Sequence, residues 1–576
     1  MTRRVFLAAA AAILIVGAIL RTVWLTSDPP TTATVGVVWH DEGAWVHNAR
    51  NRALWGAWRT DNWNPMFLTP VFTGLEYGAF RMFGVGTWQA RTVPVLSGLF
   101  AIGFLMAGLA AAANRRAALL GGLLLAGNYV FVMWNRAALM ESTMTSLVVV
   151  SWASLALARK RPAWGVLAGV AAVLAWFTKA SAAFYLAAIG IEVILAVVKR
   201  PRGSFYEKRK TTPEVVFVIA GLVAATVLIG VVFVVPHWSE YRFYNWQMSV
   251  VRKPSYTLHD IRDRATWIPI VHDFFMWMWP VLAIACVGIL GIVSRWRTAA
   301  PAERVLVLWV IVGLIELAVH DSGNERRYVM FMPALIALAA IVIGTGRPGI
   351  SAPAVRQPLA RWMAVPLLLG LGYLAAGSLL RVGFLTEIHG GDHPFHRVVM
   401  LAAGVSLGLT LALIIWWQRV ADWLAQCQIP AGAGVSIVAA TLLVDAWHIS
   451  EWARHRSTFN YQASIEVGRL LAPGALVHGK LANGLALENR IRPIFIGHGF
   501  GNYDDRLQRD DVRYILTYVS PKVGFESQQG SDMIQDLLDR YPARRVIATL
   551  VVNETGPADR AELIDKAPGS HPRAPD

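Results

Sequence analysis

The sequence predicts a polytopic α-helical membrane protein with about thirteen spans and a small α/β domain at its C-terminal end. Three observations predict this fold class. The chain has 576 residues, of which 55% are hydrophobic and only 16% are charged, whereas soluble domains carry about 25% charged residues. Many apolar stretches reach the roughly 20 residues that a helix needs to cross a bilayer. Beyond about Ser450 these stretches end, and short apolar segments between Gly and Pro turns replace them.

The first span is expected at residues 5–25. Arg3 and Arg4 precede this run, which is long for a signal peptide and has no convincing cleavage site before Trp39, so we interpret it as uncleaved. The later spans are expected at about 90–113, 117–134, 140–158, 162–177, 180–198, 214–236, 270–293, 303–320, 327–345, 361–381, 397–417 and 433–449.

Basic residues gather in every second loop between these spans, except near Arg419, where the loop is weakly charged. The basic loops include 115–116, 159–161, 199–210, 295–297 and 347–361. Loops rich in Lys and Arg stay on the cytoplasmic side of a membrane. The pattern therefore predicts an integral protein of the plasma membrane with a cytoplasmic N-terminus. Because the number of spans is odd, the C-terminal domain is expected outside the cytoplasm.

The chain is expected to divide into two domains and a tail. They are a membrane domain over residues 1–449, an extracytoplasmic α/β domain over 450–558, and a polar, Pro-rich disordered tail over 559–576. The α/β domain is predicted from its alternating segments. Its strands are expected at 475–478, 493–496, 514–518 and 546–548, and its helices at 463–472, 480–489 and 531–541.

The net charge of +16 does not indicate a nucleic-acid partner. Most of the excess charge lies in short loops between spans, and no basic helix is interleaved with aromatic residues that could stack on bases. The two cysteines, Cys286 and Cys427, fall in a span and in a loop expected on the cytoplasmic side. We therefore expect no disulfide framework.

Two adjacent acidic residues, Asp41 and Glu42, follow the first span and are expected at the outer membrane surface. Two adjacent acids at a membrane surface, followed by an aromatic stretch, form an unusual motif that could mark a functional site. Alternatively, Asp41 could cap a helix that begins near Glu42. The pair by itself does not decide between these interpretations.

Four more charged residues are expected at the same surface. Arg136 and Glu141 belong to one short turn between spans, Lys179 to another, and Arg326 opens a later span. Their expected place near the acidic pair makes the three cations and Glu141 candidate binding residues. Long basic side chains at span ends also serve as interfacial anchors, which is the alternative interpretation for all three.

Two longer outer loops carry further candidates. Residues 237–269 include Arg242, Arg252 and Lys253, which could bind a substrate or could be solvated surface charges. Residues 382–396 include potential ligands for a divalent metal ion, because imidazole and carboxylate suit several such ions; histidines in a loop are more often plain surface residues. These potential ligands are His389, Asp392, His393 and His396.

Taken in order, the motifs of residues 1–345 resemble membrane glycosyltransferases of the GT-C class, which include protein O-mannosyltransferases and lipid A aminoarabinose transferases. The matching residues are Asp41-Glu42, Asn64-Pro65, Phe83-Gly84 with Arg91, Arg136 with Glu141, Thr178-Lys179, and Arg327-Tyr328 with Pro333. The chain departs from the pattern at Met66, where many members have a second proline and then a basic residue. It departs again at Ala180, where members usually have glycine.

The resemblance implies an inverting glycosyltransferase that moves a sugar from a polyprenyl-phosphate donor to an extracytoplasmic acceptor hydroxyl. It implies that Asp41 is the catalytic base. The implied substrate-binding residues are Glu42, Arg136, Glu141, Lys179, Arg242, Arg252, Lys253 and Arg326. The identity of the sugar, the choice between a lipid, glycan or protein acceptor, and any requirement for a divalent metal ion stay open.

A secondary transporter or lipid flippase is the alternative. Such proteins place ionisable residues near the bilayer midplane, often within repeats. Here Glu192 and Glu316 are the main residues of this kind, no repeat is visible, and most polar motifs lie at the outer surface. A relative that only binds a polyprenyl lipid, without catalysis, is a third possibility.

Overall fold

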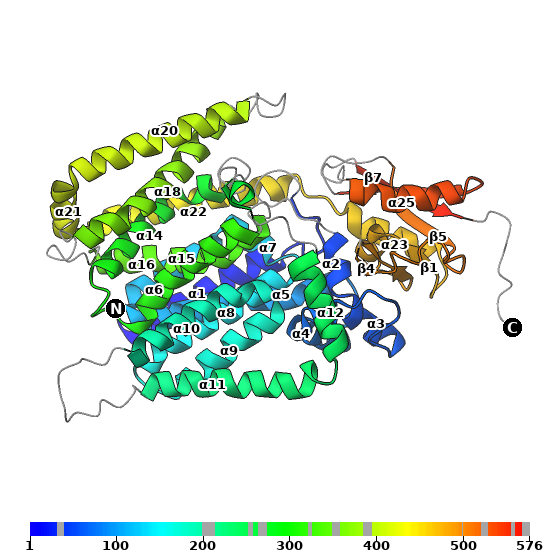
Figure 1. The fold of residues 1–576 in the computed structure, drawn as a ribbon, viewed down its shortest axis with the longest axis horizontal. Helices are drawn as coiled ribbons and strands as arrows, with labels where there is room; N and C mark the ends of the chain where they lie inside the picture. Colours follow the sequence, from blue (N-terminus) through cyan, green and yellow to red (C-terminus); the bar gives the residue numbers. More distant parts are fainter. Residues whose placement is uncertain are drawn as a thin grey trace.

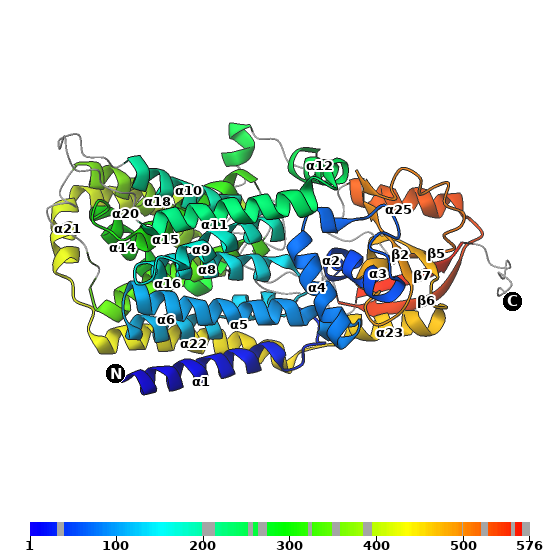
Figure 2. The same ribbon diagram turned by 90° about the horizontal axis from the view of Figure 1, so that it is seen from below.

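The chain folds into a helical bundle and a small sheet domain, which lie at opposite ends of the long axis of the molecule (Figures 1 and 2). This computed structural model describes residues 1–30, 40–198, 213–251, 257–262, 274–320, 325–347, 349, 358–383, 394–497, 499–519, 528–553 and 559–566. The N-terminus lies at the end of the bundle away from the sheet domain (Figure 2).

Helices form nearly all of the bundle; η marks short 3₁₀- or π-helical segments. The helices before residue 200 are α1 (Arg3–Thr22), α2 (His40–Trp45), α3 (His47–Trp55), η1 (Pro65–Phe67), α4 (Pro70–Phe83), α5 (Thr87–Ala112), α6 (Arg115–Gly127), α7 (Tyr129–Trp134), α8 (Met140–Ala158), α9 (Trp164–Thr178), η2 (Ala180–Ala182) and α10 (Ala183–Val198). Those after it are α11 (Pro213–Ile229), η3 (Gly230–Val234), α12 (Trp238–Trp246), η4 (Gln247–Val251), α14 (Phe274–Ser294), α15 (Pro301–His320), η5 (Glu325–Phe331), α16 (Met332–Thr345), α18 (Pro358–Gly383), α20 (Pro394–Ile415), α21 (Trp417–Gln426) and α22 (Ala431–Arg454).

The bundle has the helices that a membrane protein requires. Within the described ranges, eight helices are long and apolar enough to cross a bilayer, and three shorter apolar helices accompany them. A helix suits this environment because it satisfies its own backbone hydrogen bonds without water. The predicted fold class is confirmed, and the number of thirteen spans stays a prediction.

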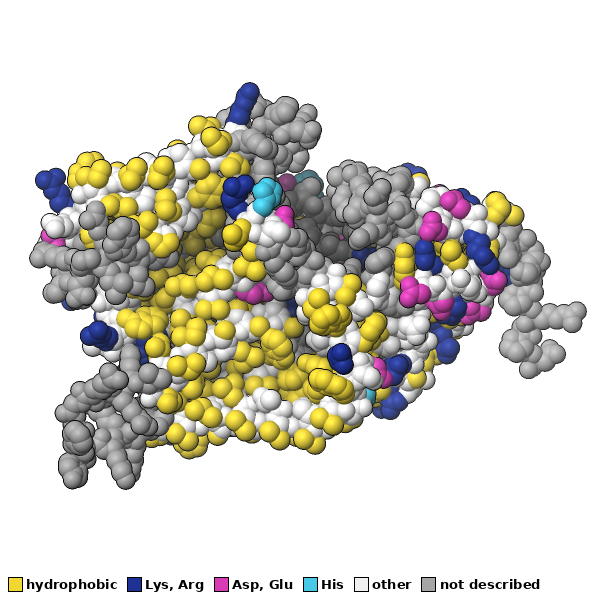
Figure 3. Space-filling view, in the orientation of Figure 1, with side chains coloured by type: hydrophobic (Ala, Val, Ile, Leu, Met, Phe, Trp, Pro, Cys, Tyr) yellow, Lys and Arg dark blue, Asp and Glu magenta, His cyan; other side chains and the backbone are white. Residues whose placement is uncertain are grey.

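Hydrophobic side chains cover much of the outside of the bundle, whereas charged side chains gather on the sheet domain and at the opposite end (Figure 3). Inside the bundle, small residues allow close helix packing, which is typical of membrane helices. At Gly108 of α5, a Cβ atom would lie 2.5 Å from the Trp152 ring and 3.0 Å from the Ala153 Cα of α8. The contact between α5 and α8 therefore depends on this glycine.

The sheet domain is a mixed α/β structure. Its elements are α23 (Phe459–Leu470), β1 (Leu476–His478), α24 (Lys480–Gly484), β2 (Arg492–Ile494), β3 (Ile496–Gly497), β4 (Phe500–Gly501), β5 (Tyr514–Tyr518), α25 (Gln528–Arg540), β6 (Arg545–Val552) and β7 (Asp559–Asp565). The main sheet has the order β2-β1-β5-β7-β6, in which β1 is parallel to both neighbours and β7 is antiparallel to both of its own. The predicted strands at 475–478, 514–518 and 546–548 and the helices at 463–472 and 531–541 are confirmed. The strand predicted at 493–496 is divided between β2 and β3, which belong to different sheets, and the helix predicted at 480–489 is shorter.

The predicted start of the tail at 559 is wrong. Residues 559–565 form β7, which pairs with β5 on one side and β6 on the other. Ala561 and Leu563 are fully buried, while Arg560 is exposed. Leu563 and Ile564 join hydrophobic cores on opposite faces of the sheet. The segment contains only three apolar residues, so its local sequence resembles a polar tail. The first predicted boundary also shifts, because α22 continues to Arg454.

Hydrogen bonds connect the sheet domain to the segments that follow α1 in the chain. The Arg50 guanidinium, 1% exposed, donates to the carbonyl oxygens of Ala486, Asn489 and Ile491 at 3.1, 2.9 and 3.0 Å. On the other side, the Glu488 carboxylate accepts from the Thr87 backbone N–H at 2.6 Å, at the start of α5. The sheet domain therefore contacts both α3 and the start of α5 directly.

Candidate functional site

The predicted acidic pair lies on α2, at the junction of the bundle and the sheet domain (Figure 1). The helix begins at His40, so Asp41 lies in its first turn, where negative charge is favoured by the helix dipole. Asp41 is partly accessible, while Glu42 is buried. The two neighbours therefore occupy different environments, although they are chemically alike.

Asp41 belongs to a cluster of four charged side chains, formed with Glu141, Lys179 and Arg326. Arg326 Nη1 donates to Asp41 Oδ2 at 2.7 Å, and Arg326 Nε lies 3.2 Å from Glu141 Oε1. The same Glu141 oxygen accepts from Lys179 Nζ. Asp41, Lys179 and Arg326 keep 19%, 14% and 17% of their side-chain surface accessible. The cluster thus combines two carboxylates and two cations that a ligand could reach.

Each member of this cluster comes from the end of a different helix. Glu141 lies in the first turn of α8, Lys179 follows the last residue of α9, and Arg326 lies in η5, just before α16. These ends lie near α2 and therefore at the end of the bundle that faces the sheet domain. Four of the nine residues predicted to form the site are brought together here.

Glu42 is held in a buried ion pair. Arg91 Nε and Nη2 donate to its two oxygens at 2.8 and 2.6 Å, and the Ala138 backbone N–H donates to it at 2.7 Å. Glu42 therefore connects α2 to α5 and to the turn before α8. A charge paired in this way orients α2, so we propose that Glu42 positions Asp41 in place of the predicted substrate contact.

Arg136 is also engaged within the protein. Its guanidinium donates to the carbonyl oxygens of Leu20, Arg21 and Trp24, at 3.1, 3.1 and 2.7 Å, and lies over the Trp452 ring at 4.6 Å. These carbonyls lie at or just beyond the C-terminal end of α1, whose last carbonyl groups have no partners within the helix. Arg136 thus stabilises the end of α1. A phosphate would have to displace these hydrogen bonds to bind the Arg136 guanidinium.

The remaining candidates lie apart from the cluster or outside the described residues. Arg242 is exposed on α12. Arg252 and Lys253 lie outside the described residues, as do the side chains proposed to bind a metal. Among the described residues, no group of three or more His, Cys, Asp or Glu side chains could hold a metal ion. The metal-binding residues proposed in the 382–396 loop are His389, Asp392, His393 and His396.

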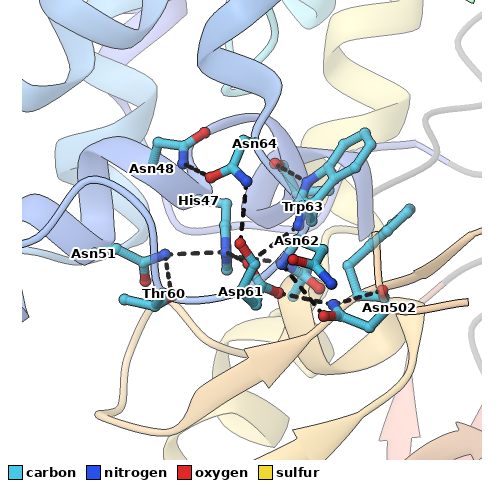
Figure 4. Close-up of polar contacts among 12 residues, drawn as sticks. His47, Asn48, Asn51, Thr60, Asp61, Asn62, Trp63, Asn64 and Asn502 are labelled. Carbon is cyan, nitrogen blue, oxygen red and sulfur yellow. Dashed lines mark hydrogen bonds and ion pairs between the residues drawn. The ribbon is translucent and has the colours of Figure 1, made fainter. Parts of the chain in front are cut away.

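A buried polar network supports the segment that follows α2 (Figure 4). His47 Nε2 lies 2.9 Å from Asp61 Oδ1, with both side chains almost fully buried. Asn502 Nδ2 donates to the other Asp61 oxygen at 3.1 Å, and Asn502 Oδ1 accepts from the Asn62 backbone N–H at 3.2 Å. The network therefore ties α3 and residues 61–62 to the sheet domain.

Glu76 of α4 is a fully buried carboxyl group near Glu42. No described residue forms a hydrogen bond with either of its oxygens. Burial raises the pKa of Glu76 well above its ordinary value of 4.5, and the charge of Glu42 raises it further. The protonated, uncharged form is therefore favoured beside the Glu42–Arg91 pair.

The sequence did not assign roles to three residues that organise this region, Arg91, His47 and Asp61. Arg91 belongs to the motif that opens the second predicted span, which marks its position but not its partner. His47 and Asp61 are ordinary polar residues of a loop. Their burial depends on the sheet domain, which begins some 400 residues later in the chain and gives no local signal.

The comparisons with known proteins agree with this architecture. The chain matches the family model described as dolichyl-phosphate-mannose-protein mannosyltransferase over residues 69–233. No curated protein sequence matches the chain significantly.

Two crystal structures of ArnT from Cupriavidus metallidurans have similar folds. The structure bound to undecaprenyl phosphate has a TM-score of 0.52 at 17% identity, covering 99% of each chain. The apo structure has a TM-score of 0.53 at 16% identity, covering 98% of this chain and 99% of the other. At this identity the likeness shows the fold. Together with the family match over residues 69–233, this fold agrees with the membrane-glycosyltransferase resemblance predicted from the sequence.

Proposed function

We propose that the chain transfers a sugar, with inversion, from a polyprenyl-phosphate donor to an acceptor hydroxyl outside the cytoplasm. The observation that carries this proposal is the cluster in which Asp41 pairs with Arg326, and Glu141 joins Arg326 to Lys179. A carboxylate and two cations at the ends of apolar helices provide a base for a hydroxyl and charges for a lipid phosphate. ArnT, which has a similar fold, was crystallised with undecaprenyl phosphate, which supports the same class of carrier here.

The reaction would be a single displacement. The acceptor oxygen forms a bond to the anomeric carbon while the bond from that carbon to the phosphate oxygen breaks. The acceptor proton passes to the Asp41 carboxylate, which acts as general base. Polyprenyl phosphate leaves with the bonding electron pair, and Lys179 and Arg326 stabilise its charge. Attack from the side opposite the leaving group inverts the anomeric configuration.

The ion pairs within the cluster indicate how binding of the donor would make Asp41 a stronger base. In the donor-free protein, Arg326 donates to Asp41 and Lys179 donates to Glu141. A phosphate at the two cations would compete with these carboxylates for the same N–H groups. Asp41 would then lose its ion pair with Arg326 and become a better proton acceptor, because an adjacent positive charge favours the ionised carboxylate.

The transporter alternative is less well supported. Of the two ionisable residues inside predicted spans, Glu192 accepts from Arg304 Nε at 2.8 Å in a buried pair. Glu316 lies 3.5 Å from Arg327 Nη1. Both carboxylates thus have a basic partner within the protein, as expected for residues that hold helices together.

Turnover of defined donors tests the proposed function. The purified full-length protein in detergent is incubated with a panel of polyprenyl-phosphate sugars, and release of polyprenyl phosphate is measured. We expect release with at least one donor, and a product whose anomeric configuration, measured by NMR, is opposite to that of the donor. Retention of configuration would contradict the direct displacement, and no release from any donor would contradict the activity.

Lys179→Met is expected to weaken binding of polyprenyl phosphate about 10- to 100-fold, because one charge-assisted hydrogen bond to phosphate is lost. Glu141 keeps Arg326 as a partner, so the variant should stay folded. The affinity is measured with polyprenyl phosphate itself. Arg242→Met, which removes an exposed cation of α12, is the control and should bind normally. Unchanged affinity for polyprenyl phosphate in Lys179→Met would show that this lysine serves only as an interfacial anchor.

The topology is tested by labelling single cysteines in a background in which Cys286 and Cys427 are replaced by Ser. The basic loop at 199–210 is predicted to be cytoplasmic, and the sheet domain extracytoplasmic. In intact cells, a membrane-impermeant maleimide should therefore label Ser531→Cys but not Ser204→Cys. The reverse pattern would place the charged cluster in the cytoplasm and overturn the proposed location of the reaction.

A further inference from the structure

A polar cleft separate from the charged cluster lies where three distant segments meet. Its volume is about 460 Å³, within the range of roughly 300–1,000 Å³ typical of small-ligand sites. Residues 59–64 form one wall, α12 forms the second, and residues 499–504 of the sheet domain form the third. Figures 1 and 2 show α12 and the sheet domain meeting at this junction.

The walls of this cleft are fixed by internal contacts. The Asn64 backbone N–H donates to Tyr244 Oη at 3.0 Å, and Tyr244 Oη donates to the Asn62 carbonyl oxygen. The rings of Tyr244 and Phe500 stack with centroids 5.9 Å apart, and Trp63 packs edge-on against Phe500 at 5.6 Å. Asn62 is held further by Asn502 (Figure 4). The cleft is therefore formed before any ligand binds.

The side chains that reach into the cleft suit a carbohydrate. Phe243 and Asn62 line it with exposed side chains, and Asp504 and Glu240 add carboxylates. An aromatic ring can cover the C–H face of a sugar and exclude water from it. Amide and carboxylate groups supply the donors and acceptors that hydroxyl groups require. This combination of ring faces and hydrogen-bonding side chains matches a hydroxyl-rich ligand.

The charges of the cleft argue against a phosphate or another strong anion. Arg59 is its single cation among the lining residues that the structure describes, and Arg59 Nη1 is already 3.0 Å from Glu240 Oε1. Asp504 adds a second negative charge. The lipid phosphate therefore belongs at Lys179 and Arg326, and the cleft is suited to an uncharged partner.

A ring contact and a hydrogen bond link the wall of the cleft to the helix that carries Asp41, the proposed base. Trp63, whose ring packs against the cleft wall, donates from Nε1 to the Ala44 carbonyl oxygen at 2.9 Å. Ala44 lies in the same short helix as Asp41, one turn later. A ligand in the cleft would therefore be held at a fixed position relative to Asp41.

We infer that this cleft binds the acceptor, and that the acceptor is a neutral glycan whose terminal sugar rests against Phe243 and hydrogen-bonds to Asn62. The inference rests on the proposed transferase function and specifies its acceptor class. A peptide acceptor would be recognised largely through backbone hydrogen bonds, whereas this cleft offers ring faces and polar side chains.

Binding is tested without the donor, so that it does not depend on catalysis. Saturation-transfer NMR is recorded on the full-length protein in detergent with a panel of neutral methyl hexosides, methyl pentosides and short neutral oligosaccharides. We expect at least one to bind, and Phe243→Ala to weaken its affinity about tenfold, as expected for the loss of one aromatic face. Asn62→Ala should weaken it as well.

Trp246→Ala is the matched control. Trp246 is an exposed aromatic residue on the same helix, and it does not line the cleft. Sugar binding should be normal in this variant, and all three variants should bind polyprenyl phosphate with the affinity of the parent protein. Equal losses in Phe243→Ala and Trp246→Ala would indicate damage to α12 and overturn the assignment.

Further outcomes separate this inference from the proposed function. If the protein releases polyprenyl phosphate from a donor but binds no neutral sugar, the glycan acceptor is overturned while the transferase function stands. Competition by Ser- or Thr-containing peptides, with no competition by sugars, would assign the cleft to a protein acceptor. If sugars bind at Phe243 but no donor is ever turned over, the proposed function fails and the acceptor role fails with it.

Discussion

Asp41→Asn is expected to lower turnover about 10²- to 10⁴-fold in a folded protein that still binds polyprenyl phosphate, because the amide cannot accept the acceptor proton. The amide oxygen can still accept a hydrogen bond from Arg326, so the local structure should survive. Binding of polyprenyl phosphate should be unchanged or tighter, because the substitution removes a negative charge that competes with phosphate for Arg326. Rates and affinities measured on the same preparation distinguish these effects.

Asp536→Asn provides the matched control. Asp536 is also paired with an arginine, Arg506, at 2.9 Å, but it lies on α25 of the sheet domain. This variant should keep the parent rate. If Asp41→Asn also turns over near the parent rate, Asp41 is not the base. Glu141, the other carboxylate of the cluster, would then be the next candidate, ahead of the buried Glu42.

Gly43→Ala is expected to lower turnover about 10²-fold, because it displaces the helix that carries Asp41. A Cβ atom at this position would lie 1.8 Å from the Asn483 carbonyl oxygen of α24. That atom belongs to the backbone of the sheet domain, so no side-chain rearrangement can relieve the overlap. A displacement of about 1 Å at a catalytic group can cost roughly this much in rate.

The expected signature of this variant is a lower kcat with normal binding of polyprenyl phosphate, because Lys179 and Arg326 do not lie on α2. Gly78→Ala in α4 is the control: a Cβ atom at Gly78 would have no neighbour within 4 Å among the described residues, so the parent rate is expected. A normal rate in Gly43→Ala would show that contact with the sheet domain does not set the position of Asp41.

Much of the fold could be predicted from local sequence. The length and hydropathy of the apolar runs predict membrane helices, since a bilayer demands both from any spanning segment. The short apolar segments after residue 450 predict the sheet domain in the same way. The exception, β7 at 559–565, has few apolar residues, so its identity as a strand depends on pairing with β5 and β6.

The candidate site could be predicted only in part. The motif order identified Asp41, Glu141, Lys179 and Arg326, whose positions at helix ends follow from where the apolar runs stop. Arg136 occupies a similar position in the sequence, yet its guanidinium turns to the carbonyls at the end of α1. The direction of a long side chain is set by nearby partners, and these come from other parts of the chain.

The sequence by itself determined that the chain spans a membrane, which segments are helical, and which charged residues lie near their ends. Tertiary structure decided which of two adjacent acids meets the cations of the cluster. Successive residues on a helix point about 100° apart, so Asp41 meets Arg326 while Glu42 enters a buried pair with Arg91. Nothing local to Asp41 and Glu42 encodes this difference, because their partners lie roughly 285 and 49 residues away and are brought to α2 only by helix packing.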